Sequence, residues 1–404
     1  MRQKTITFYL LIIIYFVSLL PPSSSANQST SRDAYWKEVV RLWQGVNYNP
    51  SAENSAKFYQ FISRSEAEDN LGLSWFIDNY LINSYRFKYE ILCGNRYIAM
   101  AALRLIKISP ESQGDKIARC LSKLIRINPA LFLEILYQER DLEVEKLRKL
   151  IISLPEENEY LYKKSFLLGG NVSEKLSYFS YYEIEKRIEA LEKLRLKEFA
   201  EIRQVCLDLL NKRLQELKVP ISLKIDFETG VDILKNLWSL PVEDKWLIFD
   251  QPLSGDEDNF DVNKNGYYQH VLLPLLEYES FAGNEFALRA LLFDIKTSII
   301  NEKEAHLWEV SRINPGCFIN GLCGFQAGKI KSFNIFSSFA FDKLSTEAKI
   351  SELQYRIELF RKLNFKNEIC EQTKKSYINK FKKLEKLYCD ILKKEMEVKK
   401  IIGN

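Results

Sequence analysis

The sequence contains few of the residues that build the commonest catalytic and metal sites. It has only two histidines, His270 and His306, and they fall in different segments of the 404-residue chain. Two separated histidines do not favour a Ser–His–Asp triad or a histidine-rich zinc site. The chain also lacks a Cys-x-x-Cys pair, a glycine-rich phosphate loop and a Gly-x-Ser-x-Gly elbow. No standard catalytic or cofactor motif is therefore indicated.

Glycine and proline are also scarce, at 15 and 11 residues, and they cluster between runs of apolar residues at helical spacing. This pattern predicts an all-α protein, with 222–227 left open as a short strand. Hydrophobic residues make up 46% of the chain, which excludes wholesale disorder. The formal net charge of +4 is small for this length and gives no reason to expect a nucleic-acid partner.

The cysteines do not have the pattern of a disulfide framework. There are seven, an odd number, spread over a long chain. We expect most of them to be buried thiols that pack as small apolar groups. Cys317 and Cys323 are close enough in sequence for a bridge, so their redox state is left open.

The N-terminus has the layout of a secretory signal. Arg2 and Lys4 precede an uncharged run from 6 to 20, and small residues follow two prolines at 21 and 22. We expect residues 1–26 to be a cleaved signal peptide, because the apolar run is short for a membrane span. An uncleaved leader would instead tether the protein to the membrane. The predicted localisation is exported, in the periplasm, in the cell envelope or outside the cell.

The remainder of the chain contains one unit written twice. Segment 89–95 returns at 278–284 and segment 126–129 returns at 312–315, at nearly constant offsets of 189 and 186 residues. Three weaker matches keep the same order: 39–43 with 233–238, 183–189 with 352–358, and 206–209 with 389–391. A tandem duplication explains this order. It divides the chain into a first helical repeat domain at 33–218 and a second at 221–404.

The recurring residues are those that begin and end helices. Gly94 and Gly283 suit the left-handed residue that closes a helix. Asn95 and its counterpart at 284 suit the cap of the next helix, and Asn-Pro at 128–129 and 314–315 suits another helix start. Antiparallel helix pairs duplicated in tandem resemble the HEAT-type α-solenoid class. The resemblance implies stacked helix pairs with an extended binding surface.

One loop resembles the opening of a calcium site. Asp261, Asn263 and Asn265 place oxygen ligands at first, third and fifth positions, and Gly266 follows. The twelfth position is Leu272 instead of the bidentate glutamate, so an acidic surface loop is the alternative. No other cofactor is predicted.

The remaining side chains of interest each have a plain structural explanation. Trp43 and Trp238 recur on amphipathic helices, where core packing is the default and a surface anchor for a partner is the alternative. Glu90 and Glu279 are expected to fix their turns or to bond to Arg126 and the arginine at 312. The lysines at 374–400 are expected on a solvated helix face, with attraction to an anionic envelope surface as the alternative.

These observations favour an exported, non-enzymatic helical protein that binds or scaffolds a protein or peptide partner. The opposing hypothesis is a secreted hydrolase that uses carboxylates converging in a cleft between the two units. A membrane-tethered envelope protein is the third, if the leader is retained. Partner identity, oligomeric state and any catalytic activity do not follow from these residues.

Overall fold

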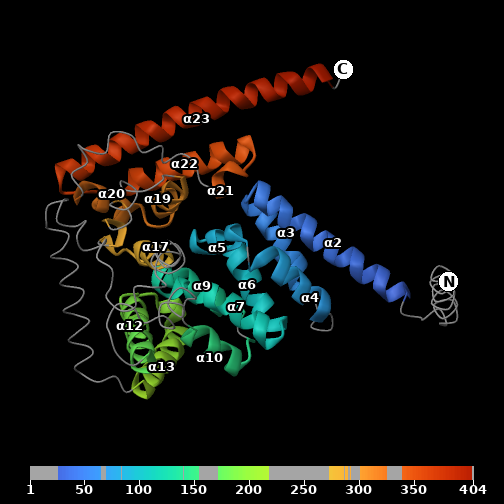
Figure 1. The fold of residues 1–404 in the computed structure, drawn as a ribbon, viewed down its shortest axis with the longest axis vertical. Coiled ribbons are helices and arrows are strands. Elements are labelled where there is room, and N and C mark those ends of the chain that lie inside the picture. Colours follow the sequence, from blue (N-terminus) through green and yellow to red (C-terminus); the bar gives the residue numbers. More distant parts are fainter. Residues whose placement is uncertain are drawn as a thin grey trace, which may run out of the picture.

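A computed structural model describes residues 26–64, 70–82, 84–139, 141–153, 172–217, 273–285, 287–289, 292, 301–324 and 339–402. Within these ranges the chain is all-helical and forms no strand, as predicted (Figure 1). The 222–227 segment, the leader up to residue 25 and the proposed boundary near 219 lie outside them. The division into two domains therefore stays a prediction. In the described ranges, no helix is both long and apolar enough to cross a bilayer.

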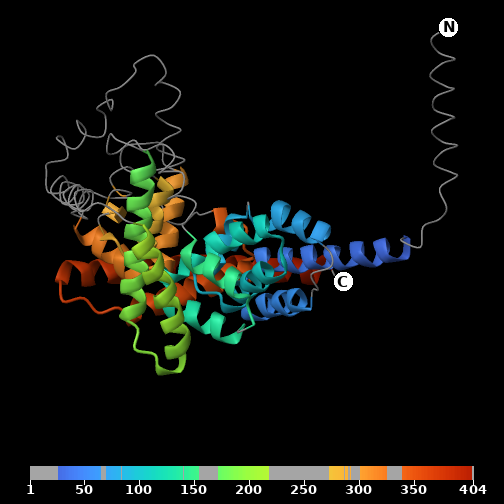
Figure 2. The same cartoon turned by 90° about the horizontal axis from the view of Figure 1, so that it is seen from below.

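The N-terminal part of the chain is a series of helices with short connections. They are α2 (Ala26–Tyr48), α3 (Ala52–Ser63), α4 (Asn70–Phe76), a π-helical turn η1 (Ile77–Leu81), α5 (Tyr85–Leu92), α6 (Arg96–Ile108), α7 (Glu111–Ser122), α8 (Leu124–Ile127), α9 (Pro129–Gln138) and α10 (Val144–Ile152). A pair of longer helices follows, α12 (Val172–Glu192) and α13 (Ala200–Glu216), with a 3₁₀ turn η2 (Lys197–Phe199) between them. These two helices lie side by side in both views (Figures 1 and 2).

The described C-terminal part of the chain is also helical. It comprises α17 (Leu273–Phe281), α19 (Asn301–Ile313), α20 (Pro315–Gly324), α21 (Phe339–Asp342), α22 (Thr346–Lys362) and α23 (Glu368–Ile402). The chain leaves the helix between α12 and α13 near Arg195, and residues 363–367 separate α22 from α23. The last turns of α23 extend past α22 (Figure 1), and their side chains are exposed.

Two apolar clusters form the core. The first gathers aromatic side chains from α2, α3, α4 and α5, with the ring centroid of Trp43 lying 5.4 Å from that of Phe58 and 5.7 Å from that of Phe87. The second lies between α19, α20, α22 and α23 around Trp308. Leu92, from the end of α5, packs in this second cluster. The early helices therefore contribute directly to the core of the later ones.

The two recurring Gly-Asn turns have the same backbone conformation. Gly94 has φ of 85° and Gly283 has φ of 96°, a region that favours glycine because it has no Cβ. After each glycine an asparagine caps the next helix: Asn95 accepts from the amide of Ile98 at 3.4 Å, and Asn284 from that of Ala287 at 3.3 Å. Tight turns between helices, predicted from the sequence, are confirmed at both positions.

The two Asn-Pro starts also match. The side chain of Asn128 accepts from the amide of Leu131 at 3.2 Å, and that of Asn314 accepts from Cys317 at 3.1 Å. The amide nitrogens of the two capping side chains also lie beside the glycine turns, each 3.3 Å from the point where a Cβ would sit on Gly94 or Gly283. Each Asn-Pro cap therefore packs against the Gly-Asn turn of its own half of the chain.

Candidate functional site

Of the residues proposed from sequence as partner and metal sites, the structure describes Trp43. Trp43 is in the core with 1% of its surface exposed, and its indole nitrogen donates to the carbonyl of Tyr80 at 3.1 Å. This position corrects the surface-anchor alternative, because a buried indole with its donor satisfied cannot reach a partner. The structure does not describe Trp238 or the loop residues Asp261, Asn263 and Asn265. The calcium site proposed for that loop therefore stays a prediction.

The described residues hold neither a metal-binding cluster nor a bridge between Cys317 and Cys323. In the described part of the chain, no three side chains of the His, Cys, Asp or Glu type gather as a metal site. Cys317 and Cys323 are both free thiols on α20. Six residues of α-helix separate them by about 9 Å along the axis, more than the roughly 7 Å that a disulfide tolerates between Cα atoms. A bridge between these two is therefore not favoured.

One buried cluster of charged side chains is centred on Glu183 of α12. Its carboxylate accepts three donors: Arg126 at 2.7 Å, Arg187 at 3.0 Å and the hydroxyl of Tyr278 at 2.7 Å. Glu183 and Arg187 are both fully buried. Tyr278 comes from α17, far away in sequence, so this cluster joins the two halves of the chain.

Arg126 makes a second bond across the same boundary. Its two terminal nitrogens donate to the carboxylate of Glu279 at 2.7 and 3.1 Å. Glu279 also accepts from the side chain of Asn284 at 3.3 Å, which ties the ion pair to the Gly-Asn turn. The expected role for Glu279, to fix its turn or to bond to an arginine, is confirmed in both forms, with the arginine supplied by the other half of the chain.

A corresponding cluster surrounds Glu352 of α22. Its carboxylate pairs with Arg356 at 2.9 Å and with Arg312 at 3.2 Å. Arg356 is fully buried and donates to the hydroxyl of Tyr89 at 3.0 Å. Tyr89 and Tyr278 are the matched tyrosines of the sequence repeat. Each of them therefore reaches into the Glu–Arg pair of the opposite half.

Burial and ion pairing have opposite effects on these carboxylates. Burial by itself raises the pKa of Glu183, but Arg126 and Arg187 outweigh it and hold the pKa below its ordinary value. The same balance, with Arg312 and Arg356 as the cations, lowers the pKa of Glu352. Both glutamates are therefore ionised and fully engaged by their partners, which is the arrangement of a structural junction.

Glu90 differs from these two carboxylates. Burial raises its pKa above the ordinary value, although Arg86 lies 3.1 Å away and Asn95 donates to it at 3.0 Å. Its bond to Asn95 holds the Gly-Asn turn, as expected from the sequence. Arg312 acts on Glu90 only as a nearby charge.

One buried carboxyl group lacks a polar partner. Glu309 on α19 is fully buried, and neither of its oxygens makes a hydrogen bond with the described residues. Burial raises its pKa well above the ordinary value, and the nearby charge of Arg356 offsets this only in part. The site of Glu309 therefore destabilises the charged form of its carboxyl group.

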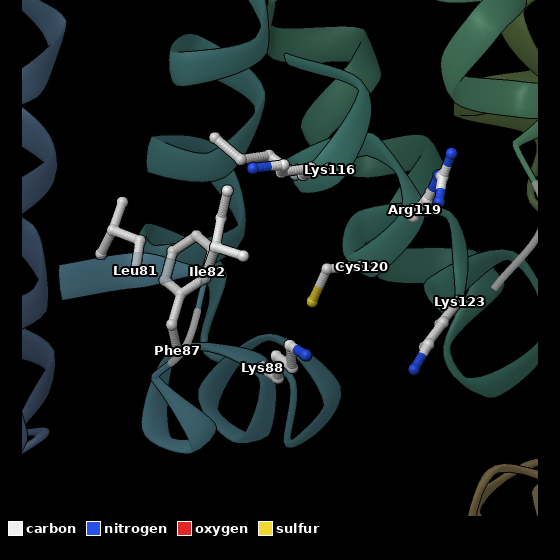
Figure 3. A pocket seen from close by; sticks show the side chains of 9 residues that line it. Leu81, Ile82, Phe87, Lys88, Lys116, Arg119, Cys120 and Lys123 are labelled. Carbon is white, nitrogen blue, oxygen red and sulfur yellow. The ribbon is translucent and has the colours of Figure 1, made fainter. Parts of the chain in front are cut away.

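A small pocket that is open to solvent lies between η1, α5 and α7 (Figure 3). Its cavity volume is about 20 Å³, which is room for about one water molecule. One wall is apolar, and four cationic side chains surround the remainder, as Figure 3 shows. The apolar lining consists of Leu81, Ile82, Phe87, Ile117 and Cys120, and the cations are Lys88, Lys116, Arg119 and Lys123.

The charged residues that line this pocket are all cations, and one of them pairs with an acid beside it. None of its lining residues is acidic. Lys116 bonds to Asp78 on η1 at 3.2 Å, with both side chains 44% exposed. Lys123 is buried, and its ammonium lies 5.6 Å from the ring centre of Tyr278. The pocket therefore combines an apolar floor with a positive rim, and the sequence patterns gave no sign of it.

The fold and these sites define a class: an all-helical protein whose two halves are joined by buried glutamates, arginines and tyrosines. Comparison with known proteins adds no name to this class, because no family model, no curated protein and no solved structure matches the chain at a significant level.

Proposed function

We propose that the chain is an exported, non-enzymatic helical protein that binds a partner polypeptide in the basic pocket between η1, α5 and α7. The observation that carries this proposal is the set of four cations around an apolar floor, with no acidic lining residue. The cavity, at about 20 Å³, is too small to enclose a side chain, so the partner would lie across its mouth.

The pocket chemistry specifies what the partner presents. The positive side chains of the lining attract an anion to the mouth of the pocket. A carboxylate of aspartate or glutamate supplies that anion and accepts charge-assisted hydrogen bonds from lysine and arginine. The partly exposed Ile82 offers an apolar contact for a side chain beside the acid. The proposed ligand is therefore an acidic residue next to leucine, isoleucine or phenylalanine in an exposed partner segment.

We further infer that the chain is a tandem duplication, with domains at 33–218 and 221–404. The matched left-handed glycines at 94 and 283 and the matched asparagine caps support this inference. The reciprocal contacts of Tyr89 and Tyr278 support it independently, because each tyrosine reaches the opposite Glu–Arg pair. The helix pairs α12–α13 and α22–α23 are the features in favour of a HEAT-like, α-solenoid arrangement.

The opposing hypothesis was a hydrolase with carboxylates in a cleft between the units. Carboxylates from both halves do converge at Arg126. However, Glu183 and Glu279 are buried and occupied by arginine, tyrosine or asparagine donors. A general acid or nucleophile has to contact the substrate. This arrangement favours a binding protein.

Export is part of the proposal and depends on the leader at 1–26. The layout of charge, apolar run and small residues supports cleavage over a retained anchor. A retained leader would place the same binding pocket at the membrane surface. Intact-mass measurement of the exported protein distinguishes the two forms.

A peptide-binding experiment tests the pocket. Short fluorescent peptides with Asp or Glu beside Leu or Phe should bind the full-length protein, and matched peptides with Asn or Gln should not. Replacing Lys88 and Lys116 together by alanine should weaken binding about tenfold or more, since each lost charged hydrogen bond is worth roughly 1.5–3 kcal/mol. Fluorescence anisotropy at low salt measures the affinity.

The matched control is Lys375→Ala, an exposed lysine on α23 outside the pocket. It should leave peptide affinity unchanged. Equal binding of the acid and amide peptides, or equal losses in the pocket variant and the control, would contradict the proposed site.

A further inference from the structure

Two cysteines from different helices lie together where α20 packs against α23. The rings of Phe318 on α20 and Tyr377 on α23 meet edge to face, with their centres 5.1 Å apart. Cys323 lies five residues beyond Phe318, and Cys370 lies seven residues before Tyr377. At 1.5 Å per residue these steps are about 7.5 and 10.5 Å. Antiparallel helices in this register bring the two cysteines to the same level.

The side chains confirm that register. The thiol of Cys323 makes a hydrogen bond with that of Cys370, and Thr373 bonds to the same sulfur of Cys323. Cys370 belongs to the second apolar cluster with 6% of its surface exposed, and Cys323 is half-buried against that cluster. One sulfur of the pair is therefore accessible and the other is held behind it.

Another cysteine on the same helix faces elsewhere. Cys317 lies close to the charges of Glu285 and Arg289. It is also six residues from Cys323 on one continuous helix. Cys323 therefore has Cys370 as its thiol neighbour, and Cys317 makes no such contact.

We propose that Cys323 and Cys370 form a disulfide that ties α20 to α23 when the protein meets an oxidising disulfide compound. The half-buried Cys323 attacks first as its thiolate, forms a mixed disulfide and releases one thiol of the oxidant. Cys370 then attacks that sulfur of Cys323, and the second thiol leaves. The two cysteines lose two protons and two electrons, and the oxidant disulfide becomes two thiols.

The surroundings of the pair determine how fast this bridge forms. Burial raises the pKa of Cys323 to about 12, so little thiolate is present at neutral pH. We therefore expect slow formation at pH 7 and faster formation as the pH rises. Once formed, the bridge closes the chain from 323 to 370, including α21 and α22, into a loop. This reduces the conformational freedom of the unfolded chain.

The test uses the full-length protein, oxidised glutathione and a reduced reference sample. After oxidation and alkylation, peptide mapping by mass spectrometry should find a peptide pair cross-linked between 323 and 370. Each bridged molecule should lose the mass of two hydrogens. The melting temperature should rise by about 5 °C or more relative to the reduced sample.

Two variants make the result specific. Cys323→Ser should give neither the cross-link nor the rise in melting temperature, whereas Cys389→Ser on α23 should give both. Comparing the reduced samples shows whether each variant folds. Alkylatable thiols at both 323 and 370 after prolonged oxidation at pH 8.5 would overturn the proposal. A glutathione adduct that stays on Cys323, or a bridge to another cysteine, would also overturn it.

Discussion

Replacing Arg126 by methionine should lower the free energy of unfolding by about 3–5 kcal/mol, the usual cost of removing one partner from a buried ion pair. The side chain of Arg126 is 8% exposed and contacts the carboxylates of Glu183 and Glu279. Without it, Glu279 loses its arginine and Glu183 keeps two of its three donors. Two buried negative charges then lie near each other with less compensation. Urea unfolding followed by circular dichroism measures the loss.

The matched control is Arg41→Met. Arg41 bonds only to Glu38 within its own helix, and its side chain is 68% exposed. We expect almost no change in stability, because exposed ion pairs of this type contribute little. Similar losses in the two variants would contradict the assignment of Arg126 as the cation that joins the halves.

Replacing Glu309 by glutamine should stabilise the protein at neutral pH, which is unusual for a substitution in a core. Glu309 is fully buried without a hydrogen-bond partner in the described part of the chain. Burial raises its folded-state pKa well above the ordinary value, and Arg356 offsets only part of this effect. The folded glutamate therefore binds its proton more tightly than the unfolded one, and ionisation as the pH rises disfavours folding.

The sign of this effect gives a pH dependence. Because the folded pKa is raised, Glu309 does not penalise folding below the unfolded-state pKa of about 4.3. As the pH rises from there toward the folded-state pKa, the wild type should lose about 1.4 kcal/mol per pH unit relative to Glu309→Gln. Unfolding curves of both proteins between pH 5 and 7 measure the difference. The control Glu397→Gln, on the exposed end of α23, should run parallel to the wild type.

A pH-independent difference between Glu309→Gln and the wild type would count against this account. It would indicate that the carboxyl group titrates alike in the folded and unfolded chains. A destabilised Glu309→Gln protein at pH 7 would indicate instead that the ionised carboxylate is held by a group outside the described residues.

Local structure could be predicted from the sequence because caps and turns depend on neighbouring residues alone. Gly94 adopts the left-handed conformation that its place before Asn95 indicated. Asn128 caps the helix that its place before Pro129 indicated. In each case a helix end requires a residue without a Cβ or with a short acceptor side chain.

The contacts between the halves could not be predicted, since they depend on how whole helices pack. The repeated Glu–Arg spacing at 183–187 and 352–356 was visible as a sequence match, but nothing local pairs Glu183 with Tyr278. The sequence pattern allowed Trp43 to be either a surface anchor or a core residue. Its burial in the folded protein shows that it is a core residue. The basic pocket was missed for the same reason, because Lys88 and Lys116 come from helices that are not adjacent in sequence.

Two double-mutant cycles test most directly whether Tyr89 and Tyr278 each join their own half of the chain to the Glu–Arg pair of the opposite half. One combines Tyr278→Phe with Glu183→Gln, and the other combines Tyr89→Phe with Arg356→Met, across the contacts of 2.7 and 3.0 Å. We expect a coupling energy of about 0.5–3 kcal/mol in each cycle, as for residues in one buried network. Additive effects in either cycle would contradict this expectation, because the reciprocal contact would then be absent from the folded protein.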